Sequence, residues 1–113
     1  MATLDYIELP VKSTGQQSAF YSKAFSWKFT SYGEDYAAHE EGPCQLGLNG
    51  TGEQQGKTIL PVIRVAEIDT AFAAVKAAGG TITQDIFAFP GGKRFHFADP
   101  EGLELACYEP ESA

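Results

Sequence analysis

The feature that most constrains the fold of this chain is that one pattern of elements occurs twice. Residues 4–11 alternate apolar and polar side chains as a strand does, and a helical pattern over 16–27 and three short strand patterns follow. The same order returns in the second half, where Val65 stands 54 residues after Val11. A small sheet with one helix leaves its other face uncovered, so the repeat predicts two modules that share one sheet.

The repeat defines one domain of two modules. In the first half we expect one strand, one helix and three strands, at residues 4–11, 16–27, 28–33, 35–41 and 44–50. In the second half we expect the same order, at residues 59–65, 67–80, 81–89, 93–99 and 103–109. A glycine-rich polar stretch at 50–57 reads as a linker between module 1, about 3–49, and module 2, about 58–110. The predicted fold is α+β: two tandem βαβββ modules forming a curled mixed β-sheet, with helices on the outer face.

Composition excludes several classes of partner. The 113 residues carry a net charge of −7, and Lys93-Arg94 is the one adjacent basic pair, so we expect no nucleic-acid partner and no anionic membrane surface. No apolar run approaches the roughly 20 residues that span a bilayer, and the N-terminus lacks a basic-then-apolar signal pattern. The expected compartment is the cytoplasm.

The two cysteines show no metal-binding spacing. Cys44 and Cys107 form no C-x-x-C motif, and no Cys/His cluster surrounds them. Each stands in a short apolar segment, which predicts two buried, reduced thiols. A disulfide or a reactive thiol is the alternative.

Two stretches resemble a known superfamily. The segment AFYSKAFSW, with Phe20-Tyr21, and the segment PGGKRFHFADPEGLELACYEP, with its Asp99-Pro100-Glu101-Gly102 turn, resemble the glyoxalase/bleomycin-resistance/extradiol-dioxygenase superfamily, the vicinal oxygen chelate fold. The resemblance covers residues 4–110 and is strongest to a bacterial glyoxalase-related branch. It implies a homodimer, and it implies little about activity because one fold hosts many functions.

The resemblance also implies where a metal would bind. Metal-dependent members place His, Gln or Glu on the first and last strand of each module. The equivalent positions here fall on Tyr6, Leu60 and Ala106, with Gln45, Leu46 or Gly47 on the fourth strand. Leu and Ala side chains have no donor atoms, so we expect no metal site and no cofactor. A divalent metal at other residues is the alternative.

Strand alternation assigns an inner face to the sheet. Its apolar wall includes Leu60, Val62 and Ala106, whereas Leu103, Leu105 and Cys107 are expected beneath the helices. Its polar residues, the candidate ligand-binding set, are Tyr6, Glu8, Arg64, Arg94, His96, Glu104 and Tyr108. Apolar walls with a few convergent polar groups are typical of ligand sites. The alternative is structural: Arg64 with Glu8, and Arg94 with Glu104, form ion pairs that hold the sheet together.

Three functions follow from these patterns. The first is a bleomycin-resistance-like protein that binds a small, partly hydrophobic molecule in a β-sheet cavity without a catalytic metal. The second is an enzyme, a metal-dependent lyase, isomerase or dioxygenase-like protein, or one that uses His96 and Glu8 as acid and base. The third is an interaction module without a ligand.

Overall fold

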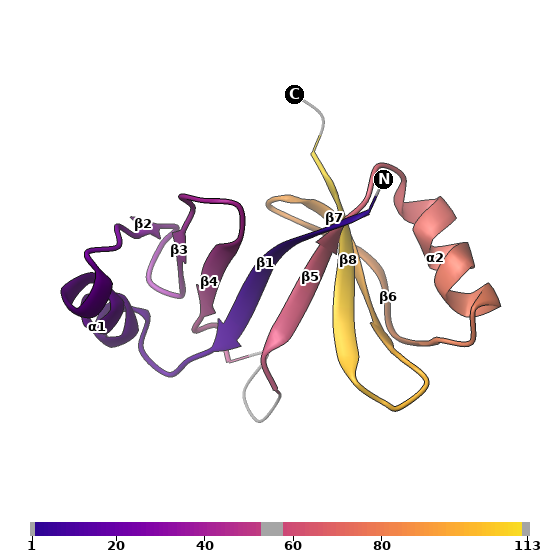
Figure 1. Ribbon diagram of the computed structural model, residues 1–113, viewed down its shortest axis with the longest axis horizontal. Helices are drawn as coiled ribbons and strands as arrows, with labels where there is room; N and C mark the ends of the chain where they lie inside the picture. The colour runs from indigo at the N-terminus through magenta and orange to yellow at the C-terminus, as the bar shows by residue number, and fades with distance from the viewer. Residues whose placement is uncertain (1, 53–57, 112–113) are drawn as a thin grey trace. The chain divides into compact units, whose positions relative to one another are not determined.

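The computed structural model describes residues 2–52 and 58–111, which contain eight strands and two helices (Figure 1). The elements of the first module are β1 (Thr3–Pro10), α1 (Thr14–Phe25), β2 (Thr30–Ser31), β3 (Tyr36–His39) and β4 (Gln45–Asn49). Those of the second module are β5 (Leu60–Arg64), α2 (Ile68–Ala77), β6 (Thr81–Phe89), β7 (Gly92–Ala98) and β8 (Glu104–Pro110).

The two modules have the same topology. In the first module the strands lie in the order β2-β3-β4-β1, and in the second in the equivalent order β6-β7-β8-β5. The first strand of each module pairs with its last strand in parallel, β1 with β4 and β5 with β8, and the other pairs are antiparallel. The predicted α+β fold of two tandem βαβββ modules, with a mixed pattern of strand pairing, is confirmed.

The chain divides into two compact units. One consists of residues 6–59, and the other joins the second module to the first residues of the chain, up to Asp5. Tyr108 on β8 donates a hydrogen bond from its hydroxyl to the Asp5 carboxylate within this second unit. The linker predicted at 50–57 lies largely outside the described residues, because 53–57 are not described.

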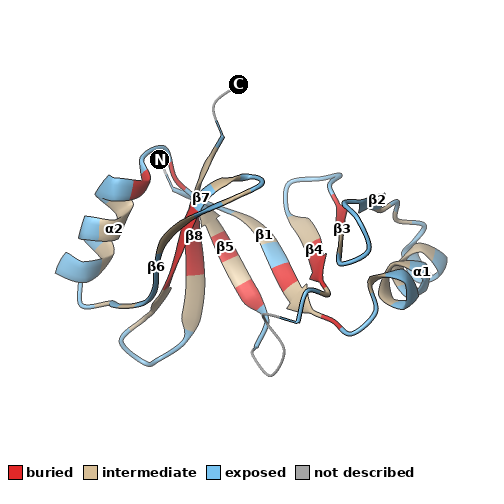
Figure 2. Ribbon diagram, turned by 180° about the vertical axis from the view of Figure 1, so that it is seen from behind, coloured by how far each residue is buried: buried red, intermediate tan, exposed pale blue. Residues whose placement is uncertain are grey.

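Helix α2 covers one face of the second module and forms the core there. Val65, Ile68, Phe95 and Cys107 are buried together, and Phe72 packs edge-on against Phe95 with ring centroids 5.1 Å apart. Val65 directly follows β5, and the other three lie on α2, β7 and β8, whose buried segments are red in Figure 2. The opposite face of the same strands therefore carries the alternate residues.

Helix α1 is bounded by two serines, one at its N-terminus and one at its C-terminus. The Ser13 hydroxyl accepts a hydrogen bond from the Gln16 backbone N–H and so caps the N-terminus of the helix. Ser26 adopts the left-handed conformation, with φ of 59°, and ends the helix, so Trp27, which the sequence prediction includes in the helix, lies beyond its end. All twelve residues of α1 are described, and none of them is buried.

Three sequence expectations about these elements are wrong. The strand expected at 28–33 contains only the two residues of β2. Cys44 is exposed, although Cys107 is buried as expected. Leu103 is 63 % exposed rather than covered by a helix, because it belongs to the turn before β8. Among the described residues, no helix is both long and apolar enough to cross a membrane.

Candidate functional site

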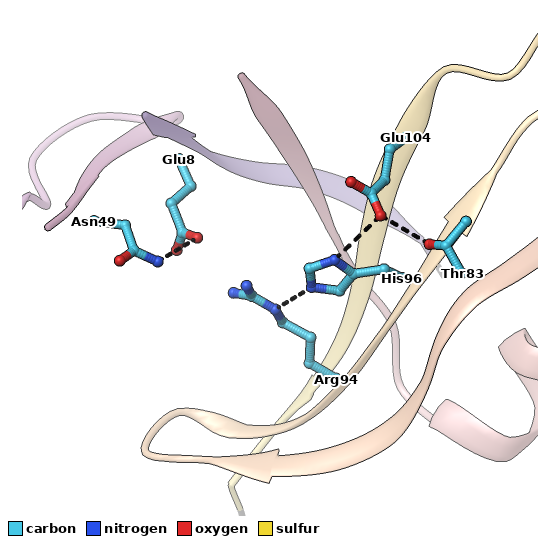
Figure 3. Close-up of polar contacts among 6 residues, drawn as sticks. All are labelled: Glu8, Asn49, Thr83, Arg94, His96 and Glu104. Atoms are coloured by element: carbon cyan, nitrogen blue, oxygen red, sulfur yellow. Dashed lines mark hydrogen bonds and ion pairs between the residues drawn. The ribbon is translucent and has the colours of Figure 1, made fainter. Parts of the chain in front are cut away.

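A chain of polar contacts crosses the second module on the face opposite α2. Glu104 begins β8, His96 and Arg94 are alternate residues of β7, and Thr83 lies on the neighbouring strand β6 (Figure 3). The Thr83 hydroxyl donates to Glu104 Oε2 over 2.8 Å, and the same oxygen lies 3.6 Å from His96 Nδ1. Arg94 Nε donates to His96 Nε2 over 3.0 Å. His96 therefore links a carboxylate to a guanidinium.

The contact with Arg94 fixes the protonation state of His96. A guanidinium nitrogen can only donate, so Nε2 of the imidazole is the acceptor and carries no proton. The ring is neutral while this bond persists, and its proton lies on Nδ1, facing Glu104. Because a general base needs an available lone pair, this geometry favours a positioning role for His96.

Aromatic rings hold the guanidinium of Arg94 from β6. Its central carbon lies 5.7 Å from the ring centroid of Phe87 and 5.4 Å from that of Phe89, distances at which the ring faces attract a cation. Arg94 is buried, with 6 % exposure, and His96 is completely buried. Glu104 is more accessible than either of them, because its side chain is 22 % exposed.

A second polar cluster surrounds Glu8 in the first module. Asn49 Nδ2 donates to Glu8 Oε1 and the Tyr36 hydroxyl donates to Oε2, each over 3.1 Å (Figure 3 shows the Asn49 contact). The Asn49 amide is oriented by Thr51, whose backbone N–H and hydroxyl both donate to Asn49 Oδ1. Glu8 is only 2 % exposed, so these donors replace water around a buried carboxylate.

Gly47 makes the Tyr36 contact with Glu8 sterically feasible. It lies opposite Glu8 in the β1–β4 register and opposite Ala38 in the β3–β4 register. A Cβ at this position would overlap the Tyr36 hydroxyl oxygen and lie 3.0 Å from the carbon that bears it. The phenol of Tyr36 therefore crosses the strand in the space that the missing side chain leaves.

Strand register places the predicted binding residues of the second module on one face. Arg64 pairs with Tyr108, Tyr108 with Arg94, and Ala106 with both Val62 and His96. Arg64 is exposed, unlike its neighbours on this face. In the first module, Tyr6 and Glu8 alternate along β1 and so share one face. A ligand-binding role for this set stays a prediction.

The sequence prediction missed the contributions of β6 and of two first-module side chains. Thr83, Phe87 and Phe89 complete the Arg94 cluster, and Tyr36 and Asn49 complete the Glu8 cluster. Alternation in residues 81–89 could have indicated the former, because Ile82 and Ile86 belong to the α2 core. The β6–β7 register shifts twice along this strand, which is invisible to sequence reasoning.

The positions equivalent to the superfamily metal ligands do not fit a metal. Leu60 and Ala106 are buried and have hydrocarbon side chains, so neither can supply a lone pair. On the fourth strand, Gln45 is the register partner of Tyr6, whereas Leu46 pairs with Ile7. Across residues 2–52 and 58–111, no three His, Cys, Asp or Glu side chains gather in a group that could hold an ion.

The fold and these equivalent positions define the class of protein. The family model of the Glyoxalase/Bleomycin resistance protein/Dioxygenase superfamily matches residues 3–106. The chain belongs to this superfamily, as its sequence segments suggest. No curated protein matches the chain.

Solved structures share the fold at low sequence identity. A hypothetical protein from Bacillus halodurans is 18 % identical, with a TM-score of 0.80, over 99 % of this chain and 96 % of that one. A protein described as NAD-dependent benzaldehyde dehydrogenase from Legionella pneumophila is 17 % identical, with a TM-score of 0.79, over 94 % and 98 %. Methylmalonyl-CoA epimerase from Mycobacterium tuberculosis is 13 % identical, with a TM-score of 0.77, over 96 % and 88 %. These likenesses concern the fold alone.

Proposed function

We propose that this superfamily member binds a small, partly hydrophobic molecule without a catalytic metal. The observation that carries the proposal is the face of the second module opposite α2. There Leu60 and Ala106 occupy the metal-ligand positions, and the Glu104–His96–Arg94 contacts fix polar groups beside apolar and aromatic side chains. Apolar surface with a few oriented polar groups is the usual composition of a ligand site.

The polar residues of this face would have different roles in binding. Glu104, held by Thr83 and partly exposed, would accept a hydrogen bond from the ligand. Phe87 and Phe89 are half-buried and would contact its apolar part, and exposed Arg64 lies at the edge of the same face. His96 and Arg94 would act as positioning residues. A cytoplasmic location and a homodimer, the latter implied by the superfamily resemblance, belong to the same proposal.

A thermal-shift screen tests the binding function. The probes are a panel of small aromatic metabolites and bleomycin-type antibiotics, because a ligand that binds only the folded protein raises its Tm. A compound at about 100 times its Kd should stabilise the protein by roughly 2.7 kcal/mol. We expect Glu104→Gln and Arg64→Ala to weaken this response, with Glu41→Gln, an exposed change in the first module, as the matched control. A response equal in all variants would refute this binding face.

Metal analysis tests the metal-free part of the proposal. We expect purified protein to contain no stoichiometric divalent ion, and its Tm to remain unchanged with a chelator or with added zinc, manganese or nickel. The reason is that Leu60 and Ala106 cannot ligate an ion. One tightly held ion per chain would contradict the proposal and favour the metal-dependent lyase, isomerase or dioxygenase-like alternative.

A further inference from the structure

Helix α1 presents an apolar and basic outer face. Phe20 is 59 % exposed, and Lys23 and Ala24 follow it at the spacings of three and four residues that share one side of a helix. By contrast, α2 buries Ile68 in the core of its module. Aromatic side chains are enriched at protein–protein interfaces, so a phenylalanine this exposed is a candidate for contact with a partner.

Positive charge is concentrated around this helix. Residues 9–33 contain three lysines and no acidic residue, whereas the chain as a whole carries −7, so the remaining residues carry −10. Lys12, Lys23 and Lys28 are all exposed. The segment containing α1 is thus electrostatically complementary to most of the rest of the chain.

The turn between β7 and β8 exposes an apolar side chain beside an acidic one, which complements the apolar and basic face of α1. Asp99 Oδ1 accepts hydrogen bonds from the backbone N–H groups of Glu101 and Leu103, and Gly102 adopts a φ of 88°. These contacts hold the turn in one conformation, with Leu103 63 % exposed and Glu101 exposed beside it. The turn therefore offers one apolar and one acidic side chain on a rigid support.

We propose that the α1 face of one chain docks onto the Asp99–Leu103 turn of a second copy. Phe20 would contact Leu103, and Lys23 would pair with Glu101. A second copy is the favoured occupant because every chain carries both complementary surfaces. This inference rests on the homodimer of the proposed function and names its interface.

Charge exchange with sedimentation equilibrium tests this interface. We expect Lys23→Glu and Glu101→Lys each to raise the dimer Kd on the order of tenfold, because each places like charges together. The double variant should return to near the wild-type Kd. Phe20→Ser should also raise the Kd on the order of tenfold, since buried aromatic side chains are frequent hot spots.

Matched controls make the outcomes distinct. Lys93→Glu and Glu41→Lys change the same charges at exposed residues that belong to neither surface, and they should leave the Kd unchanged. A wild-type chain that stays monomeric over the whole concentration range of the sedimentation experiment would refute the proposal. So would a dimer whose Kd is unaffected by either single exchange, or is not restored in the double variant. Ligand-dependent thermal shifts in a monomeric protein would leave the binding function standing without this interface.

Discussion

At the scale of single residues, the absence of a side chain at position 47 determines how a buried carboxylate is satisfied. Glu8 accepts from Tyr36 and Asn49, and the Tyr36 phenol reaches it only across Gly47. Gly47 does not have a positive φ, so its requirement is for space rather than for backbone freedom. A small residue thereby controls a polar contact that it does not itself make.

Gly47→Ala should displace the Tyr36 hydroxyl from Glu8. We expect a loss of roughly 1–3 kcal/mol in the free energy of unfolding, because a buried carboxylate loses a donor. Chemical denaturation of Gly47→Ala, Tyr36→Phe and the double variant measures this. Since both changes remove one hydrogen bond, their costs should be less than additive. Fully additive costs would show that the two residues act independently.

The two cysteines should differ sharply in reactivity. Burial raises the pKa of the Cys107 thiol to about 11, whereas Cys44 is exposed. At pH 8, a thiol reagent should label one cysteine per native chain and two in denaturant, and Cys44→Ser should abolish the native reaction. Rapid labelling of Cys107 in the native protein would contradict its burial.

The same thiol links stability to alkaline pH. Its folded pKa exceeds the ordinary value of 9.0, so its contribution to stability is fully present below that value. The contribution is lost as the pH rises from about 9 through about 11. Cys107→Ala should remove this part of the alkaline decline in the denaturation midpoint.

At the scale of elements, α2 receives its N-terminal cap from a strand. Glu67, its N-cap residue, makes no capping hydrogen bond from its side chain to the described residues. Instead, Glu109 Oε1 on β8 accepts from the Ile68 backbone N–H over 2.9 Å. A carboxylate at this end also interacts favourably with the helix dipole.

Glu109→Ala should therefore destabilise the attachment of α2 by about 1 kcal/mol. Glu109→Gln keeps an acceptor and loses the charge, so it should cost less. Hydrogen exchange of the α2 amides, compared with those of α1 as the internal control, measures this. Equal exchange in both helices of Glu109→Ala would argue against a capping role.

The helices and strands could be predicted from the sequence more accurately than the residues at which they end or the register in which the strands pair. Alternation placed Arg94, His96, Ala106 and Tyr108 on one face, as their register shows. It assigned no inner face to residues 81–89, although Phe87 and Phe89 there alternate with the core residue Ile86. It extended the first helix to Trp27 because apolar spacing continues there, although Ser26 leaves the helical conformation. Local backbone changes of this kind leave no periodic signal.

At the scale of the whole molecule, the first residues of the chain stabilise its second half. The Tyr108 hydroxyl donates to Asp5, and residues up to Asp5 group with the second module. We expect Asp5→Ala to lower the free energy of unfolding by about 1 kcal/mol and to reduce hydrogen-exchange protection in β8. Leu4→Ala, at a 65 % exposed neighbour, is the control. An effect confined to first-module amides would contradict this assignment.

The parallel pairing of β1 with β4, and of β5 with β8, has a consequence for biosynthesis. A parallel partner must come from a distant part of the chain, so neither module can close its sheet until its final strand has left the ribosome. The nascent chain therefore exposes an unpaired β1 while α1, β2 and β3 are being made. Folding of this protein should therefore proceed in two steps, one after residue 49 has emerged and one after residue 110 has emerged.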